Sequence, residues 1–213
     1  MRAKFEESTK RFFKPVIGGI FGLTSVFISL CFEIAVLIST PDFNYSEKMI
    51  SELGIGPGSM FFNLGLIICG IIAIPFYISL GNALSHENVN EKTRKKAIYV
   101  SIFSCITFSL IGCFPIIPDN IWLLLFHGIF VFLSISSAII YCILFSVLML
   151  KNPEFSKFQA YLGFFAAGIY ILFLCTWHPI TEWLMLFALI PFLTVNSLDL
   201  IYRRKTIKKK SIE

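Results

Sequence analysis

The sequence predicts an all-α, polytopic membrane protein, a bundle of six transmembrane helices with both termini in the cytoplasm. Three observations lead to this prediction: the composition, the long apolar stretches and the placement of the basic residues. Hydrophobic residues make up 56% of the 213-residue chain and charged residues 15%, against roughly 45–50% and 25% in a soluble domain. A water-soluble fold of this size has nowhere to bury that surface, so a bilayer is the expected surrounding.

Six predominantly apolar stretches are each long enough to cross a membrane, because a helix needs about 20 residues to span a hydrocarbon core of about 30 Å. The first stretch is too long for the apolar core of a signal peptide and ends without a small-residue cleavage site, so we expect it to be retained. A single transmembrane domain covering residues 1–213 is expected, with helices at approximately 15–39, 59–84, 97–117, 121–150, 158–177 and 182–202.

Turn-forming residues separate these helices in order. The longest loop, residues 40–58, ends in Gly56-Pro57-Gly58, which is typical of tight turns and leads into the second helix. The connection Pro118-Asp119-Asn120 predicts a tight turn before the fourth helix, and either of its polar residues is suited to cap that helix. Pro179, directly after His178, makes one continuous helix from the fifth into the sixth stretch improbable.

The basic residues set the orientation, because cytoplasmic loops of membrane proteins are rich in Lys and Arg. Of the 18 Lys and Arg residues, Lys48 alone lies on the side of the 40–58 loop. We therefore expect a multi-pass protein of the cell membrane with both termini cytoplasmic and that loop outside. The basic tail after the last helix is expected to anchor it against anionic lipid. Membrane lipid is thus the expected partner, and nucleic acid is not.

Small and polar residues recur along single faces of the predicted helices. A step of three or four residues in the first helix gives a stripe that lets a neighbouring helix approach closely. Steps of seven keep residues on one face of the other helices, so each helix is expected to have an inner side, mostly a packing seam. The first stripe is Gly18, Gly22, Ser25, Ser29 and Glu33; the others are Asn63, Gly70 and Tyr77, then His127, Ser134 and Tyr141, then Glu182, Leu189 and Asn196.

Ionisable residues gather toward the outer ends of the predicted helices. Carboxylates and imidazoles are costly at membrane depth and usually face a bundle interior or a cavity. We therefore expect one outer pocket, with Glu33 near it and Ser51 just ahead of the second helix. The residues expected to converge there are Glu52, Asn63, Asp119, His127, His178 and Glu182.

Several of these residues lie in segments that resemble a known family. Ile50-Ser51-Glu52-Leu53-Gly54, Phe62-Asn63-Leu64-Gly65, Gly112-Cys113-Phe114-Pro115 before His127, and a late Glu182 resemble the signature of the domain-of-unknown-function family 998. Glu52 departs from the aspartate associated with that family. The family is similar in layout to membrane proteins related to autophagy modulators and to remodellers of GPI-anchor lipid. The resemblance implies a six-helix fold with a polar outer pocket, and it implies no established reaction.

Three functions are compatible with the polar residues. One is a lipid-directed hydrolase or transferase that binds a metal such as zinc, which takes three protein ligands and leaves a position for water. Without metal, a histidine paired with a carboxylate could act as general base and activate Ser51; Glu52 is a further candidate catalytic residue. The candidate metal ligands are His127, His178, Asp119 and Glu182.

The second function is non-enzymatic: a lipid-binding, lipid-handling or scaffold protein whose polar cluster closes the outer ends of the bundle. In it, His127 would hydrogen-bond Asp119 or Asn63, and Glu33 would bond a serine or a histidine. The third is a transporter that uses Glu33 and His127 as a relay. It is disfavoured because the polar residues become sparse toward the cytoplasmic side and no discontinuous helix pair is evident.

Overall fold

The computed structural model describes residues 15–117 and 119–210, and it describes side chains as far as Tyr202. The regular secondary structure of this part of the chain consists of helices, and six of them are long and apolar enough to cross a membrane. The all-α, six-helix prediction is confirmed, and the spans are consistent with an integral multi-pass membrane protein. The elements are α2 (Pro15–Ser39), the 3-10 helix η1 (Ile50–Gly54), α3 (Ser59–Ala83), α4 (Glu91–Cys113), α5 (Ile121–Lys151), α6 (Lys157–Thr176) and α7 (Pro179–Lys210).

Two helix starts differ from the sequence expectation. Helix α4 begins at Glu91 rather than 97, because the side chain of Asn90 accepts a 3.0 Å hydrogen bond from the Thr93 N–H and so caps a polar first turn. Helix α7 begins at Pro179 rather than 182, since proline is tolerated in the first turn of a helix, where its missing N–H has no helical partner. The expected break before α7 is present: Trp177 ends α6 in a left-handed conformation with φ of 47°.

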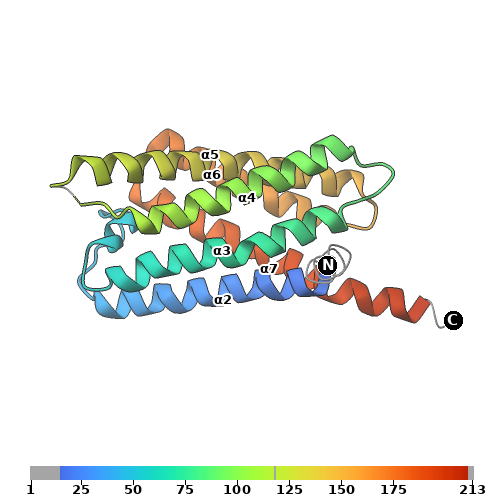
Figure 1. Cartoon of the computed structure of the whole chain (residues 1–213), viewed down its shortest axis with the longest axis horizontal. Helices are drawn as coiled ribbons and strands as arrows, with labels where there is room; N and C mark the ends of the chain where they lie inside the picture. Colours follow the sequence, from blue (N-terminus) through green and yellow to red (C-terminus); the bar gives the residue numbers. More distant parts are fainter. Residues whose placement is uncertain (1–14, 118, 211–213) are drawn as a thin grey trace, which may run out of the picture.

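The six helices close into a ring. Each one packs against the next along the chain, and α7 returns to pack against α2 (Figure 1). One end of the ring carries η1, residues 114–117 and the start of α7. We call it the η1 end, and the end where α7 terminates the opposite end (Figure 1). This antiparallel arrangement, in which only the connection from α2 to α3 is long, gives every helix an inner face.

Small residues allow α2 to approach both of its neighbours. A Cβ atom added at Gly18 would overlap the Ser79 side chain of α3, and one added at Gly22 would overlap the Ser197 hydroxyl of α7. One turn further on, the Ser25 hydroxyl donates a 3.2 Å hydrogen bond to the Cys69 carbonyl. This first half of the predicted stripe is therefore a packing seam, as expected where helices associate in a membrane.

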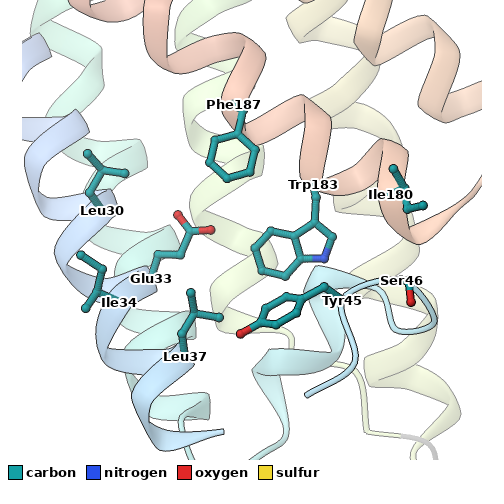
Figure 2. A pocket seen from close by; sticks show the side chains of 9 residues that line it. All are labelled: Leu30, Glu33, Ile34, Leu37, Tyr45, Ser46, Ile180, Trp183 and Phe187. Carbon is teal, nitrogen blue, oxygen red and sulfur yellow. The ribbon is translucent and has the colours of Figure 1, made fainter. Parts of the chain in front are cut away.

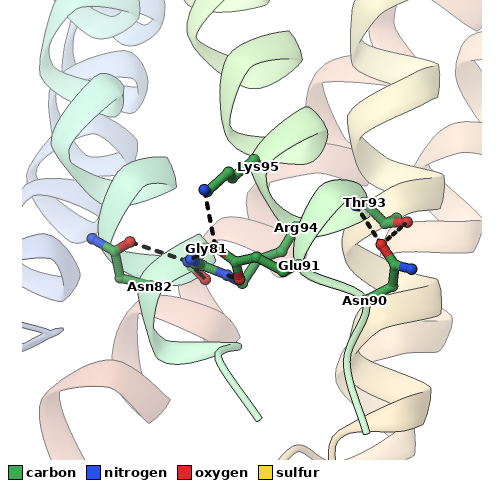
Figure 3. A network of polar contacts seen from close by, with 7 residues as sticks. All are labelled: Gly81, Asn82, Asn90, Glu91, Thr93, Arg94 and Lys95. Carbon is green, nitrogen blue, oxygen red and sulfur yellow. Dashed lines mark hydrogen bonds and ion pairs between the residues drawn. The ribbon is translucent and has the colours of Figure 1, made fainter. Parts of the chain in front are cut away.

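At the opposite end, Arg94 joins the start of α4 to the end of α3 (Figure 3). Its guanidinium donates a 2.9 Å hydrogen bond to the Gly81 carbonyl and a 3.2 Å bond to the Asn82 side chain. It also binds both carboxylate oxygens of Glu91 at 2.7 Å. A basic residue expected only to flank the membrane thus satisfies a carbonyl near the C-terminus of α3, where carbonyls lack helical partners.

Candidate functional site

A cavity of about 220 Å³ lies inside the ring, lined by all six helices and η1. Its polar lining belongs in part to the predicted inner faces, since Tyr77, Ser134 and Tyr141 all reach it. The hydroxyl of Tyr77 donates a 2.9 Å hydrogen bond to that of Tyr141 in the buried core. The polar residues around the cavity are Ser25, Ser29, Glu33, Ser51, Tyr77, Ser104, Ser134, Tyr141, Tyr170 and Glu182.

A second hollow is an open groove of about 510 Å³ between α2 and α7 at the η1 end (Figure 2). Aliphatic side chains of α2 form one wall. Trp183 and Phe187 of α7 form the other, and Tyr45 and Ser46 of the connecting loop close the end of the groove. The Trp183 ring packs edge-on against Tyr45, with centroids 5.3 Å apart, and against Phe43 at 6.4 Å. These contacts hold the loop against the first turns of α7.

Glu33 lines both hollows. It lies six residues before Ser39, the last residue of α2, or about 9 Å along the helix. Figure 2 shows its carboxyl group pointing from α2 toward α7, into the space between Phe187 and Trp183. Its Oε1 atom is buried and has no hydrogen-bond partner among the described residues. The expected bond from Glu33 to a serine or histidine is therefore not made by this oxygen, and an acceptor remains available to a ligand.

Glu182 and Glu52 hold the start of η1. Glu182 Oε2 accepts a 2.6 Å hydrogen bond from the Ile50 N–H, and Ser51 also hydrogen-bonds this carboxylate through its backbone and its hydroxyl. Glu52 Oε1 accepts a 2.9 Å bond from the Met49 N–H. Both carboxylates thus satisfy N–H groups that have no partner inside the short helix. At the other end of η1, the Asn63 side chain donates a 3.0 Å bond to the Gly54 carbonyl.

The two candidate histidines, His127 and His178, line neither hollow. His127 is buried in α5, and its Nδ1 lies 2.8 Å from the Phe114 carbonyl, so it fastens α5 to the end of α4 rather than to Asp119 or Asn63. His178 is exposed between α6 and α7, where its Nδ1 accepts a 3.2 Å hydrogen bond from the Ile180 N–H.

Asp119 is also outside both hollows. It is exposed in the turn before α5 and does not cap that helix. The neighbouring Asn120 is the cap, because its side-chain oxygen accepts 3.2 Å hydrogen bonds from the N–H groups of Trp122 and Leu123. Of the two capping candidates named from the sequence, the structure uses Asn120.

The candidate catalytic set is assembled only in part. Ser51, Glu52, Asn63 and Glu182 come together around η1, whereas His127, His178 and Asp119 line neither hollow. Within residues 15–117 and 119–202, no three His, Cys, Asp or Glu side chains form a group that could hold a metal ion. The expected ligand set of His127, His178, Asp119 and Glu182 is therefore not brought together, because each histidine is held by the backbone of a different connection.

The groove itself was missed by sequence reasoning. Trp183 and Tyr45 form its aromatic side, and Trp183 Nε1 is a second buried polar atom of the groove that has no partner in the described part of the chain. Aromatic residues at helix ends are typical of membrane interfaces. That signal marks Trp183 as an interfacial residue, but it does not predict that α2 and α7 separate here to leave a hollow.

Comparison of the chain with protein-family models, with curated proteins and with solved structures gives no match. The resemblance to the domain-of-unknown-function family 998 therefore stays a prediction.

Proposed function

We propose that the protein binds a membrane lipid at its η1 end, with an aliphatic chain in the groove between α2 and α7 and the polar group of the lipid at Glu33. The observation that carries this proposal is the position of Glu33: its Oε1 is buried, has no partner among the described residues and lies where the groove and the cavity meet. A buried polar atom without a partner is costly unless a ligand or water satisfies it.

The groove has the character of a ligand site for an amphiphile. Its volume of about 510 Å³ lies within the roughly 300–1,000 Å³ of typical small-molecule pockets. It opens sideways between two candidate spans, where acyl chains would lie in a bilayer. Because lipid chains are as apolar as the groove walls, packing alone gives little preference for one lipid. Selection must then come from the polar end, at Glu33.

Binding is favoured over turnover by the surroundings of the candidate nucleophile. Ser51 lies beside the Glu182 carboxylate, and neither His127 nor His178 lines the cavity that Ser51 reaches. A hydroxyl nucleophile needs a base within hydrogen-bond reach whose orientation is fixed by a third group. The Glu182 carboxylate is within reach of the Ser51 hydroxyl, but it also accepts hydrogen bonds from the η1 backbone, and no histidine lines the cavity to complete such a set. We therefore place the protein among lipid-binding and lipid-handling membrane proteins, acting at the outer leaflet if the basic residues set its orientation.

Native mass spectrometry in a mild detergent tests the proposal. The wild-type chain should retain about one lipid per protein, as expected for a single site. Ile34→Trp should reduce the retained lipid severalfold, because Ile34 lines the groove and a larger side chain fills it. Ile20→Trp is the matched control: Ile20 lies on the same helix with 52% exposure against 57% for Ile34, and it does not line the groove.

Two results would overturn the proposal. One is a wild-type chain that carries no more lipid than Ile34→Trp. The other is a dimer that Ile34→Trp disrupts and Ile20→Trp does not, since a second copy of the chain would then cover the groove.

A further inference from the structure

We infer that the site selects lipids whose polar group is an uncharged or positively charged hydrogen-bond donor, a hydroxyl or an amine, and that it rejects lipids with an anionic head. This inference rests on the proposed function and specifies the class of ligand. It follows from the charges and the free hydrogen-bonding atoms around the two hollows.

Acidic groups, and no basic ones, are found around the two hollows. Two carboxyl groups, those of Glu33 and Glu182, line the cavity, and Glu33 also lines the groove; among the described residues, no Lys, Arg or His lines either hollow. The one basic residue of the neighbouring loop, Lys48, lies over the Phe43 ring at 5.8 Å from its centroid and lines neither hollow. Burying a charge is costly unless an opposite charge pairs with it, so an anionic head at Glu33 would lie beside two carboxyl groups with no compensating cation.

Three of the hydroxyl groups that line the cavity donate their protons to the protein. Two are serines: Ser25 donates to the Cys69 carbonyl and Ser104 to the Ser134 carbonyl at 3.1 Å. Tyr77 donates to Tyr141 in the same way. A hydroxyl that has donated its proton offers only lone pairs. These groups therefore add acceptors to the cavity, and a donor is the complementary ligand group.

The two carboxyl groups differ in their hydrogen bonds. Glu182 already accepts hydrogen bonds from the backbone of η1, whereas Glu33 Oε1 accepts none from the described residues. Glu33 is therefore the group that receives the ligand. The unpartnered donor of the groove, Trp183 Nε1, points away from Glu33 toward the side of Ser46 (Figure 2). It is not placed to donate to a head group that sits on Glu33.

The test compares four compounds with one chain length: 1-dodecanol, dodecylamine, dodecanoate and dodecyl phosphate. Each is titrated onto the delipidated wild-type protein, and binding is measured by native mass spectrometry. We expect the alcohol and the amine to bind at least about tenfold more tightly than the two anions, a factor that corresponds to about 1.4 kcal/mol. Equal binding of all four compounds, or tighter binding of either anion, would overturn the inference.

Substitution at Glu33 separates the contribution of charge from that of hydrogen bonding. Glu33→Gln keeps an acceptor oxygen and removes the carboxylate, so binding of dodecylamine should fall about tenfold, while binding of 1-dodecanol stays near wild type. Glu47→Gln is the control, since Glu47 is an exposed carboxylate in the loop that follows α2 and lines neither hollow. Unchanged amine binding in Glu33→Gln would contradict the inference.

The two proposals fail in different ways. If none of the four compounds binds the wild type and Ile34→Trp retains as much co-purified lipid as the wild type, the proposed function itself is wrong. If all four bind equally and Ile34→Trp abolishes their binding, the groove is a lipid site without selection for the head group. In that case only the inference about selection of the head group is wrong. The comparison of the four compounds uses the wild-type protein, so it does not depend on the folding of any variant.

Discussion

The carboxylate of Glu182 accepts a 2.6 Å hydrogen bond from the backbone N–H of Ile50, across 132 residues of sequence. This contact fastens the first turn of α7 to η1. Ile50, Ser51 and Leu53 of η1 in turn line the η1 end of the central cavity. One side chain of the last helix thus fixes the segment that closes the cavity, and it does so through the backbone, where the identity of the η1 residue matters little.

Glu182→Ala should lower the free energy of unfolding by about 1.5–3 kcal/mol. The substitution removes a hydrogen bond to a charged acceptor and leaves the N–H of Ile50 without its partner. Glu182→Gln keeps an acceptor oxygen, so its free energy of unfolding should fall less than that of Glu182→Ala. Thermal unfolding of the purified protein in detergent measures both, with the exposed Glu47→Ala as control. A melting temperature for Glu182→Ala equal to that of the control would show that the contact does not stabilise the fold.

Gly22→Ala should destabilise the bundle by about 1–3 kcal/mol, the usual cost of overpacking a close contact. An added Cβ would overlap the Ser197 hydroxyl and the Phe76 ring, so α2 would have to move away from α7 and α3. Gly128→Ala is the matched control, because no atom lies within 4 Å of a Cβ added there. That variant should be neutral or slightly more stable, since alanine favours a helix over glycine. Equal melting temperatures for the two variants would contradict this packing of α2.

Single cysteines at Ser46 and Asn90, in a background without native cysteines, should react with an impermeant reagent from opposite faces of the membrane. Ser46 lies at the η1 end and Asn90 caps α4 at the opposite end. The basic residues predict that Ser46 is outside and Asn90 inside. Labelling intact cells and then inverted vesicles decides the orientation. Reaction of both positions from one face would be incompatible with six spans.

The fold was largely predictable because its signals are local. Apolar length defines the six spans, and the break before α7 follows from Pro179. The starts of α4 and α7 were placed too late because their first turns include polar residues, which hydropathy assigns to loops. The 3-10 helix η1 was not predicted, since a five-residue element depends on contacts from outside it, here Glu182 and Asn63.

The site was less predictable because it depends on tertiary partners. The stripe of α2 placed Glu33 on an inner face, where it lines the cavity, yet the groove that it also lines is formed jointly by α2, α7 and the loop with Tyr45 and Ser46. His127 was grouped with other ionisable side chains, whereas its partner is the backbone carbonyl of Phe114. Every residue has a backbone carbonyl, whatever its side chain. The sequence therefore does not distinguish a buried histidine that hydrogen-bonds a carbonyl from a histidine that binds a metal.

Substitution of the two histidines should therefore have unequal effects on stability. His127 is only 6% exposed, and its Nδ1 donates to the Phe114 carbonyl at 2.8 Å, so His127→Ala should cost about 1–3 kcal/mol through the lost bond, together with a cavity. His127→Asn keeps a side-chain donor and should recover part of that loss. His178 is exposed, and His178→Ala should stay within about 0.5 kcal/mol of the wild type. Thermal melts of the three variants measure these differences. If the histidines were paired ligands of one site, His127→Ala and His178→Ala would have similar, small effects on the melting temperature, contrary to this expectation.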